Sequence, residues 1–60
     1  MSKKAVESIY DALFSLTDIR VILRSSAPNH ILNLEEKEAV RNAILRVEED
    51  IRTMRKELIE

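Results

Sequence analysis

The single histidine of this chain, His30, is the first residue to consider for chemistry, because imidazole is the commonest metal ligand and a frequent general base. Helical bundles that bind two metal ions combine a histidine with a glutamate three residues earlier, and His30 has no such partner. The chain contains no cysteine, so a structural zinc site would lack its usual ligands. We therefore expect no metal and no cofactor, and a solvent-facing or capping role for His30.

Two hydroxyl side chains, those of Ser15 and Thr17, lie near the carboxyl group of Asp18 in the sequence, and nucleophilic catalysis could use such a combination. A hydroxyl nucleophile needs a base that takes its proton, and the sequence positions none beside these residues. The sequence therefore predicts no catalytic residue, and we expect that the protein is not an enzyme.

Basic side chains are candidates for binding nucleic acid. Lysines and arginines number 10 against 11 aspartates and glutamates, and the net charge of −1 gives no overall attraction to a polyanion. A phosphate-binding surface clusters its positive charge, whereas here acidic residues interrupt the arginines, and Glu48 stands in the favourable order to pair with Arg52. We interpret the arginines as a solvated surface and keep nucleic-acid binding as an alternative, with the candidates Arg20, Arg24, Arg41, Arg52 and Arg55.

Two apolar series, in which the spacing alternates between four and three residues, predict the elements that must position these side chains. Such spacing places the apolar residues on one face of a helix that packs against other helices. The first series is Ala5, Ile9, Ala12, Leu16, Ile19 and Leu23, and the second is Val40, Ile44, Val47, Ile51, Met54 and Leu58. We expect these twelve residues to form the core of an oligomer.

The two predicted helices span about residues 3–25 and 34–59, with a turn over about 26–33 between them. Pro28 lies in the turn and disfavours helix at the residue before it. Because the turn is short, the helices should lie antiparallel. We therefore interpret residues 1–60 as a single all-α domain, an αα-hairpin.

Both helix starts carry capping signals. Ser2 can accept a hydrogen bond from the backbone of the first helix, and Asn33 is followed three residues later by Glu36, which is the pattern of a capping box. The neighbouring Glu35 and Glu38 also suit the positive end of a helix dipole. We interpret this acidic group as a helix start and not as a cation site.

The turn itself has two unusual properties. The chain contains no glycine, so a left-handed turn residue would have to be Asn29 or another non-glycine residue. Ile31 and Leu32 are apolar in an otherwise polar segment. We expect these two side chains to fold back over the end of a bundle.

The size of the chain favours self-association. A domain of about 60 residues buries only about 60% of the surface that its unfolded chain exposes, and small domains usually need reinforcement. Without cysteine a disulfide is excluded. The sequence therefore predicts that two hairpins form an antiparallel four-helix bundle as a homodimer.

A further apolar group lies on a different side of the first predicted helix and comprises Tyr10, Phe14 and Val21. It either joins the dimer core or remains as an exposed apolar patch, and such patches mark interaction sites. These three residues are the candidate face for a protein partner.

The resulting functional prediction is a non-enzymatic interaction module, such as an adaptor, assembly factor or regulator. The predicted arrangement is similar in outline to the Rop-type plasmid copy-number regulators, dimeric helical hairpins that bind paired RNA loops; this likeness of architecture carries no residue roles with it. The alternatives are a Rop-like regulator that binds RNA or DNA, and a subunit of a larger hetero-assembly.

We expect a cytoplasmic protein with itself and another protein as partners. Uninterrupted apolar runs reach only three residues, far fewer than the roughly 20 that a membrane-spanning helix needs. The first residues also lack the apolar segment of a secretory signal.

Overall fold

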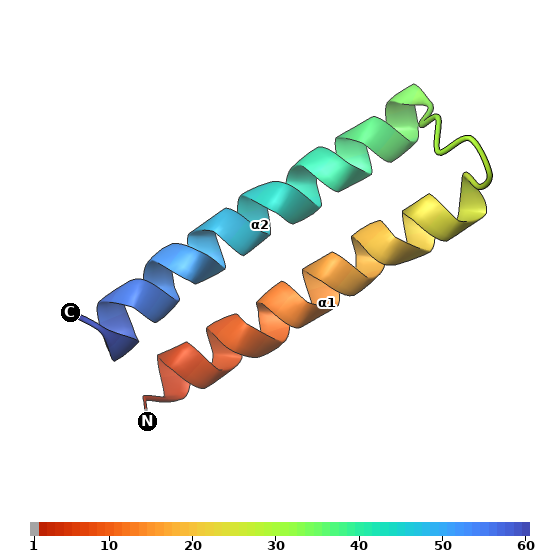
Figure 1. The fold of residues 1–60 in the computed structure, drawn as a ribbon. Helices are drawn as coiled ribbons and strands as arrows, with labels where there is room; N and C mark the ends of the chain where they lie inside the picture. Colours follow the sequence, from red (N-terminus) through yellow and green to blue (C-terminus); the bar gives the residue numbers. More distant parts are fainter. Residues whose placement is uncertain (1) are drawn as a thin grey trace.

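The computed structural model describes residues 2–60 as two antiparallel helices joined by one turn (Figure 1). Helix α1 spans Lys3–Ser25 and helix α2 spans Leu34–Leu58. The hairpin measures 40 by 15 by 14 Å, and both termini lie at the end opposite the turn. The predicted all-α hairpin is confirmed. Within residues 2–60, neither helix combines the length and the apolar character of a membrane-spanning segment.

Side-chain caps begin both helices, as predicted. The Ser2 hydroxyl accepts a hydrogen bond from the Ala5 backbone N–H at 3.0 Å. Asn33 Oδ1 accepts from the Glu36 N–H at 2.8 Å, and Glu36 Oε1 accepts from the Asn33 N–H at 2.9 Å, which completes a capping box. Each cap satisfies backbone donors that a helix start leaves free, typically worth about 1 kcal/mol.

His30 closes the turn. Its φ of 56° lies in the left-handed region, so a non-glycine residue adopts the left-handed conformation. Its Nδ1–H donates to the Leu23 carbonyl oxygen at 3.0 Å, and its backbone N–H donates to the Ser26 carbonyl oxygen at 2.9 Å. The expected capping role is confirmed, because the ring satisfies a carbonyl that the end of α1 leaves free.

The two apolar turn residues differ in exposure within the single hairpin, and their predicted place over the end of a bundle stays a prediction. Leu32 is partly buried, but Ile31 is 77% exposed and does not fold back. A pair of helices has no enclosed end for Ile31 to cover, because a bundle end requires more than one layer. The side chain therefore has nothing to pack against within the hairpin.

Small side chains form the seam between the two helices. On α1 the buried residues are Ala5, Ser8, Ala12 and Ser15, again spaced by three and four, and α2 contributes Ala43. Among residues 2–60 the only buried apolar residues are alanines, and no large side chain is fully buried. The two backbones can therefore approach closely, but the hairpin contains no core of large apolar side chains.

Each predicted apolar series divides between this seam and the solvent. On α2, Val40, Val47 and Met54 are partly buried, whereas the residues that alternate with them, Ile44, Ile51 and Leu58, are exposed. On α1, Ala5 and Ala12 are buried, Ile9 and Ile19 are partly buried, and Leu16 and Leu23 are exposed. Packing between α1 and α2 thus covers one flank of each series and leaves the other flank open.

Close packing at the seam can be tested with Ala12→Leu. The added methylenes have no space between the backbones, so we expect the free energy of unfolding to fall by about 1–3 kcal/mol. Thermal unfolding followed by circular dichroism measures this change. Thr17→Leu is the control, because Thr17 is exposed and the same side chain there meets only solvent. Equal midpoints for the two variants would contradict a close seam.

Candidate interaction surface

One side of the hairpin carries an apolar surface that the described chain covers only in part, and we call it the open apolar face. It consists of Ile9, Leu16 and Leu23 from α1 and Ile44, Ile51 and Leu58 from α2. Leu16, Ile44, Ile51 and Leu58 are 51%, 46%, 47% and 49% exposed. Within each helix the members recur every seven residues, so they form a line along the helix.

An ion pair across the seam establishes that these two lines lie on the same side. Arg46 Nη2 donates to Asp11 Oδ1 at 2.7 Å. Asp11 directly precedes the seam residue Ala12, and Arg46 follows the seam residue Ala43 by three, so these two flanks of the helices share one side. The other flanks, which carry the open apolar face, therefore share the opposite side.

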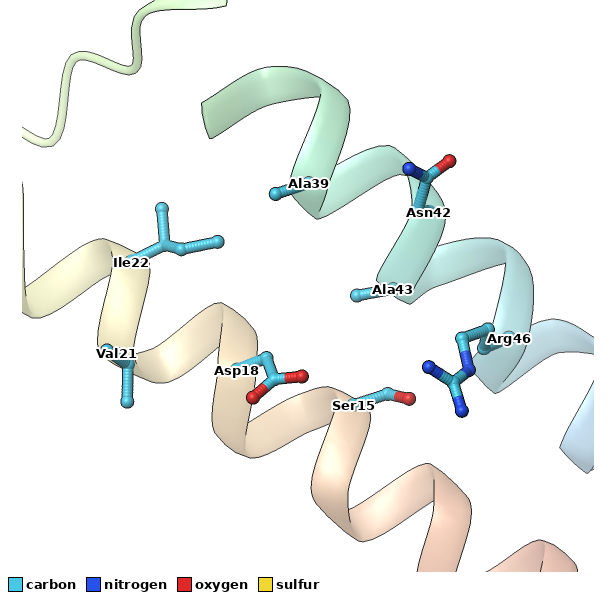
Figure 2. A pocket seen from close by; sticks show the side chains of 8 residues that line it. All are labelled: Ser15, Asp18, Val21, Ile22, Ala39, Asn42, Ala43 and Arg46. Carbon is cyan, nitrogen blue, oxygen red and sulfur yellow. The ribbon is translucent and has the colours of Figure 1, made fainter. Parts of the chain in front are cut away.

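The side with Asp11 and Arg46 is more polar. A hollow of about 380 Å³ lies there. Figure 2 shows the side chains that line it, which are Ser15, Asp18, Val21 and Ile22 of α1 and Ala39, Asn42, Ala43 and Arg46 of α2. Ser15 is buried at the seam and Asp18 is exposed. The residues that line this hollow include a hydroxyl, a carboxylate and a guanidinium group, but no histidine that could activate Ser15.

The candidate partner face of α1 is exposed but does not form one patch. Phe14 is 70% exposed, and Tyr10 and Val21 are also exposed. Tyr10 and Phe14 line a hollow of about 470 Å³ that also includes Asp11, whereas Val21 lines the separate hollow of Figure 2. Phe14 and Val21 lie toward the polar side, so they are not members of the open apolar face.

The five candidate arginines are exposed and do not gather into one basic cluster. Arg41 Nη1 lies 2.6 Å from Glu38 Oε2, and Arg52 Nη1 lies 2.7 Å from Glu49 Oε2. The predicted pairing of Arg52 with Glu48 is therefore wrong, because Glu49 is the partner one turn away. Arg20 and Arg24 are on α1, and Arg55 is near the end of α2. Exposed pairs of this kind contribute only tenths of a kcal/mol.

Sequence reasoning missed a pair of carboxyl groups in the seam. Asp11 of α1 and Asp50 of α2 face each other beside Arg46, and Oδ2 of Asp50 is buried without a hydrogen-bond partner among the described residues. Two ionised carboxylates cannot bond to each other, because neither has a donor. A proton on Asp50 supplies that donor, and Asp11 then accepts the hydrogen bond.

This arrangement moves the two pKa values apart. Burial, reinforced by the hydrogen bond and the charge of Asp11, raises the pKa of Asp50 from 3.8 to about 6. The hydrogen bond from Asp50, with help from Arg46, lowers the pKa of Asp11. The pair can therefore hold one proton, which is on Asp50 and forms a hydrogen bond to Asp11. Among residues 2–60, no three His, Cys, Asp or Glu side chains gather so that they could hold a metal ion.

One feature of the sequence could have identified Asp50. It follows Ala43 by seven residues, so it lies on the same line of the helix as the small seam residue. The pattern of large apolar residues directs attention to the neighbouring line instead. Asp11 has no comparable signal, because its partners are on the other helix.

The carboxyl pair predicts that the hairpin is more stable at pH 5 than at pH 7.5. Asp50, whose pKa is raised in the fold, contributes stability that is complete below 3.8 and lost as the pH rises through about 6. Asp11, whose pKa is lowered, contributes stability that is present above pH 3.8 and is lost as the pH falls below that value. This contribution therefore does not change between pH 5 and pH 7.5. With allowance for solvent screening, we expect about 1 kcal/mol between pH 5 and pH 7.5, or about 4–8 °C in the melting midpoint.

Asp50→Asn tests whether this pair is the cause. The amide donates to Asp11 at every pH, so the variant should melt at the same temperature at pH 5 and pH 7.5. Asp18→Asn is the matched control, because Asp18 is exposed on α1 outside the pair. If Asp50→Asn retains the full pH dependence, another group is responsible.

The chain was also compared with known proteins. No family model, no curated protein and no solved structure matches it. The functional argument therefore depends on the geometry and chemistry of the hairpin.

Proposed function

We propose that this protein is a non-enzymatic protein–protein interaction module that works as a homodimer, in which two hairpins stack their open apolar faces to form a four-helix bundle. The division of each apolar series between seam and solvent carries the proposal. It is clearest on α2, where Val47 and Met54 pack toward α1 while Ile44, Ile51 and Leu58 remain exposed.

Four-helix geometry explains why both flanks of a series are apolar. Each helix in such a bundle contacts two neighbours, one on each side of its core-facing line. The seam supplies one neighbour for α1 and α2, and a second hairpin supplies the other. An isolated pair of helices needs only one apolar flank on each helix.

The energy available on the open apolar face is of the size that association requires. Completing the burial of a half-exposed leucine or isoleucine contributes roughly 1 kcal/mol, so the ten exposed members in two copies contribute roughly 10 kcal/mol. Association costs about 4–15 kcal/mol in lost freedom. These values support a dimer whose population depends on concentration.

The charge distribution favours a protein partner over nucleic acid. Arg41 and Arg52 each form an ion pair with a glutamate on their own helix. A duplex or structured RNA would have to compete with these carboxylates, and with a net charge of −1 there is no general attraction to overcome that competition. We therefore assign the function to association with protein, as an adaptor, assembly factor or regulator.

The proposal predicts that Ile51→Asp abolishes the dimer and Phe14→Asp does not. Ile51 is in the open apolar face, and a carboxylate there would be buried without a partner, which should weaken dimerisation at least about a hundredfold. Phe14 is even more exposed but lies toward the polar side, so the same substitution should leave the dimer intact. Light scattering coupled to gel filtration measures the mass, and 7.0 kDa is the mass of one chain.

Two outcomes would contradict this function. If Phe14→Asp dissociates the dimer and Ile51→Asp does not, the hairpins associate through the other side. If the unmodified chain is a weakly helical monomer at high concentration, the apolar face requires a different chain, as in a hetero-assembly.

A further inference from the structure

We infer that the second copy binds with its turn at the opposite end of the bundle, so that α2 packs antiparallel to α2 and Arg41 of each copy pairs with Glu48 of the other. This inference rests on the proposed homodimer and specifies its arrangement. It follows from the placement of charges along the rim of the open apolar face.

Arg41 and Glu48 are seven residues apart on α2, so they lie on one line of the helix. Both line a hollow of about 410 Å³, together with Lys37 and the apolar residues Leu32, Val40, Ile44 and Leu45. The rim thus carries the positive charges of Lys37 and Arg41 on one side of Ile44 and the negative charge of Glu48 on the other. If a second copy of this surface is rotated by 180°, its negative charge faces the positive charges of the first copy, and the reverse.

A two-fold axis through the level of Ile44 and Leu45 brings the opposite charges together. In a two-fold interface, if residue i contacts residue j of the second copy, then j also contacts i. Antiparallel α2 helices centred at this level place Arg41 opposite Glu48 of the second copy, and Glu48 opposite its Arg41. The level lies close to the middle of α2, which spans Leu34–Leu58, so the helices overlap along nearly their full length.

Both side chains are available for this contact. Among residues 2–60, Glu48 takes part in none of the three salt bridges, because Arg52 bonds to Glu49 instead. Arg41 pairs with Glu38, but both groups are more than 60% exposed. A guanidinium group has five N–H donors, so Arg41 can hold Glu38 and Glu48 of the second copy together.

The opposite arrangement, with both turns at one end, brings like charges together. In this arrangement α1 of one copy packs against α2 of the second copy. The residues that face each other are then at the same levels as in the α1–α2 contact within one hairpin. In that register Asp11 lies between Arg46 and Asp50, so Arg20, nine residues further along α1, lies between Lys37 and Arg41. Three cations would share that contact, and like charges at an interface disfavour it.

A charge exchange tests the pairing. Arg41→Glu and Glu48→Arg each create two like-charge contacts per dimer, and each should weaken dimerisation about tenfold at low salt. The double variant restores both contacts with reversed sign and should return the dissociation constant to within about threefold of the original. Lys56→Glu is the control, because Lys56 follows Asn42 by fourteen residues and so lies on the line of α2 that faces the polar side. Sedimentation over a dilution series measures the constants, and failure of the double variant to recover would overturn the pairing.

A distance measurement tests the arrangement without altering the interface. The chain has no cysteine, so Asn29→Cys introduces one labelling position at the exposed turn. Spin labels should be about 40 Å apart, the length of the hairpin, if the turns lie at opposite ends. With the turns at one end they would be within roughly 20 Å, because neighbouring helix axes are about 10 Å apart.

The outcomes separate this inference from the proposed function. A dimer with a short label distance would overturn the arrangement and leave the homodimer intact. A chain that remains monomeric in both experiments would overturn the homodimer and the arrangement together.

Discussion

Close contact between small side chains holds the two helices together, and the other features of the hairpin depend on it. Ala5 and Ala12 of α1 and Ala43 of α2 let the backbones approach, because no bulky group separates them. The same closeness leaves no space for a larger side chain at the positions of Ala5, Ala12 and Ala43. The large apolar side chains therefore lie beside these positions. Ile19, Val47 and Met54 are partly buried, whereas the flank that carries the open apolar face is left for a further layer of protein to cover. A seam of small residues thus gives a hairpin that is well aligned but has little core.

The carboxyl pair contributes to this alignment at the cost of stability near neutral pH. Asp50 occupies a seam position and has a buried oxygen that needs a donor, and Asp11 and Arg46 are the groups beside it. A rotation of either helix would separate Asp11 from Arg46 and leave the carboxylates without a cation. Buried polar groups of this kind can select one arrangement among several that apolar contacts alone would tolerate. Here they favour the rotation that directs both apolar lines to the same side.

Local signals in the sequence predicted the hairpin better than they predicted its seam. The caps at Ser2 and Asn33 are formed by neighbouring residues, and the spacing by three and four identifies both helices, so these features need no tertiary information. Local signals do not decide which of two adjacent lines of a helix faces the other helix. The lines that contain Ala43 and Ile44 both follow the helical period, and only the shape of the facing helix decides that the smaller residue lies inside. The contact of Asp11 with Asp50 joins distant parts of the chain, and no local pattern indicates it.

Several polar groups of this hairpin are committed to structural bonds. His30 bonds to a carbonyl oxygen at the end of α1, Glu36 caps α2, and Arg46 bonds to Asp11 across the seam. Each of these groups thus stabilises a turn, a helix start or the seam, and a group committed to a structural bond is poorly placed to take or give a proton to a substrate. The surface left without a partner within the hairpin is apolar and runs along both helices. Burial of such a surface is favoured by the exclusion of water, and this is the physical basis of the proposed dimer.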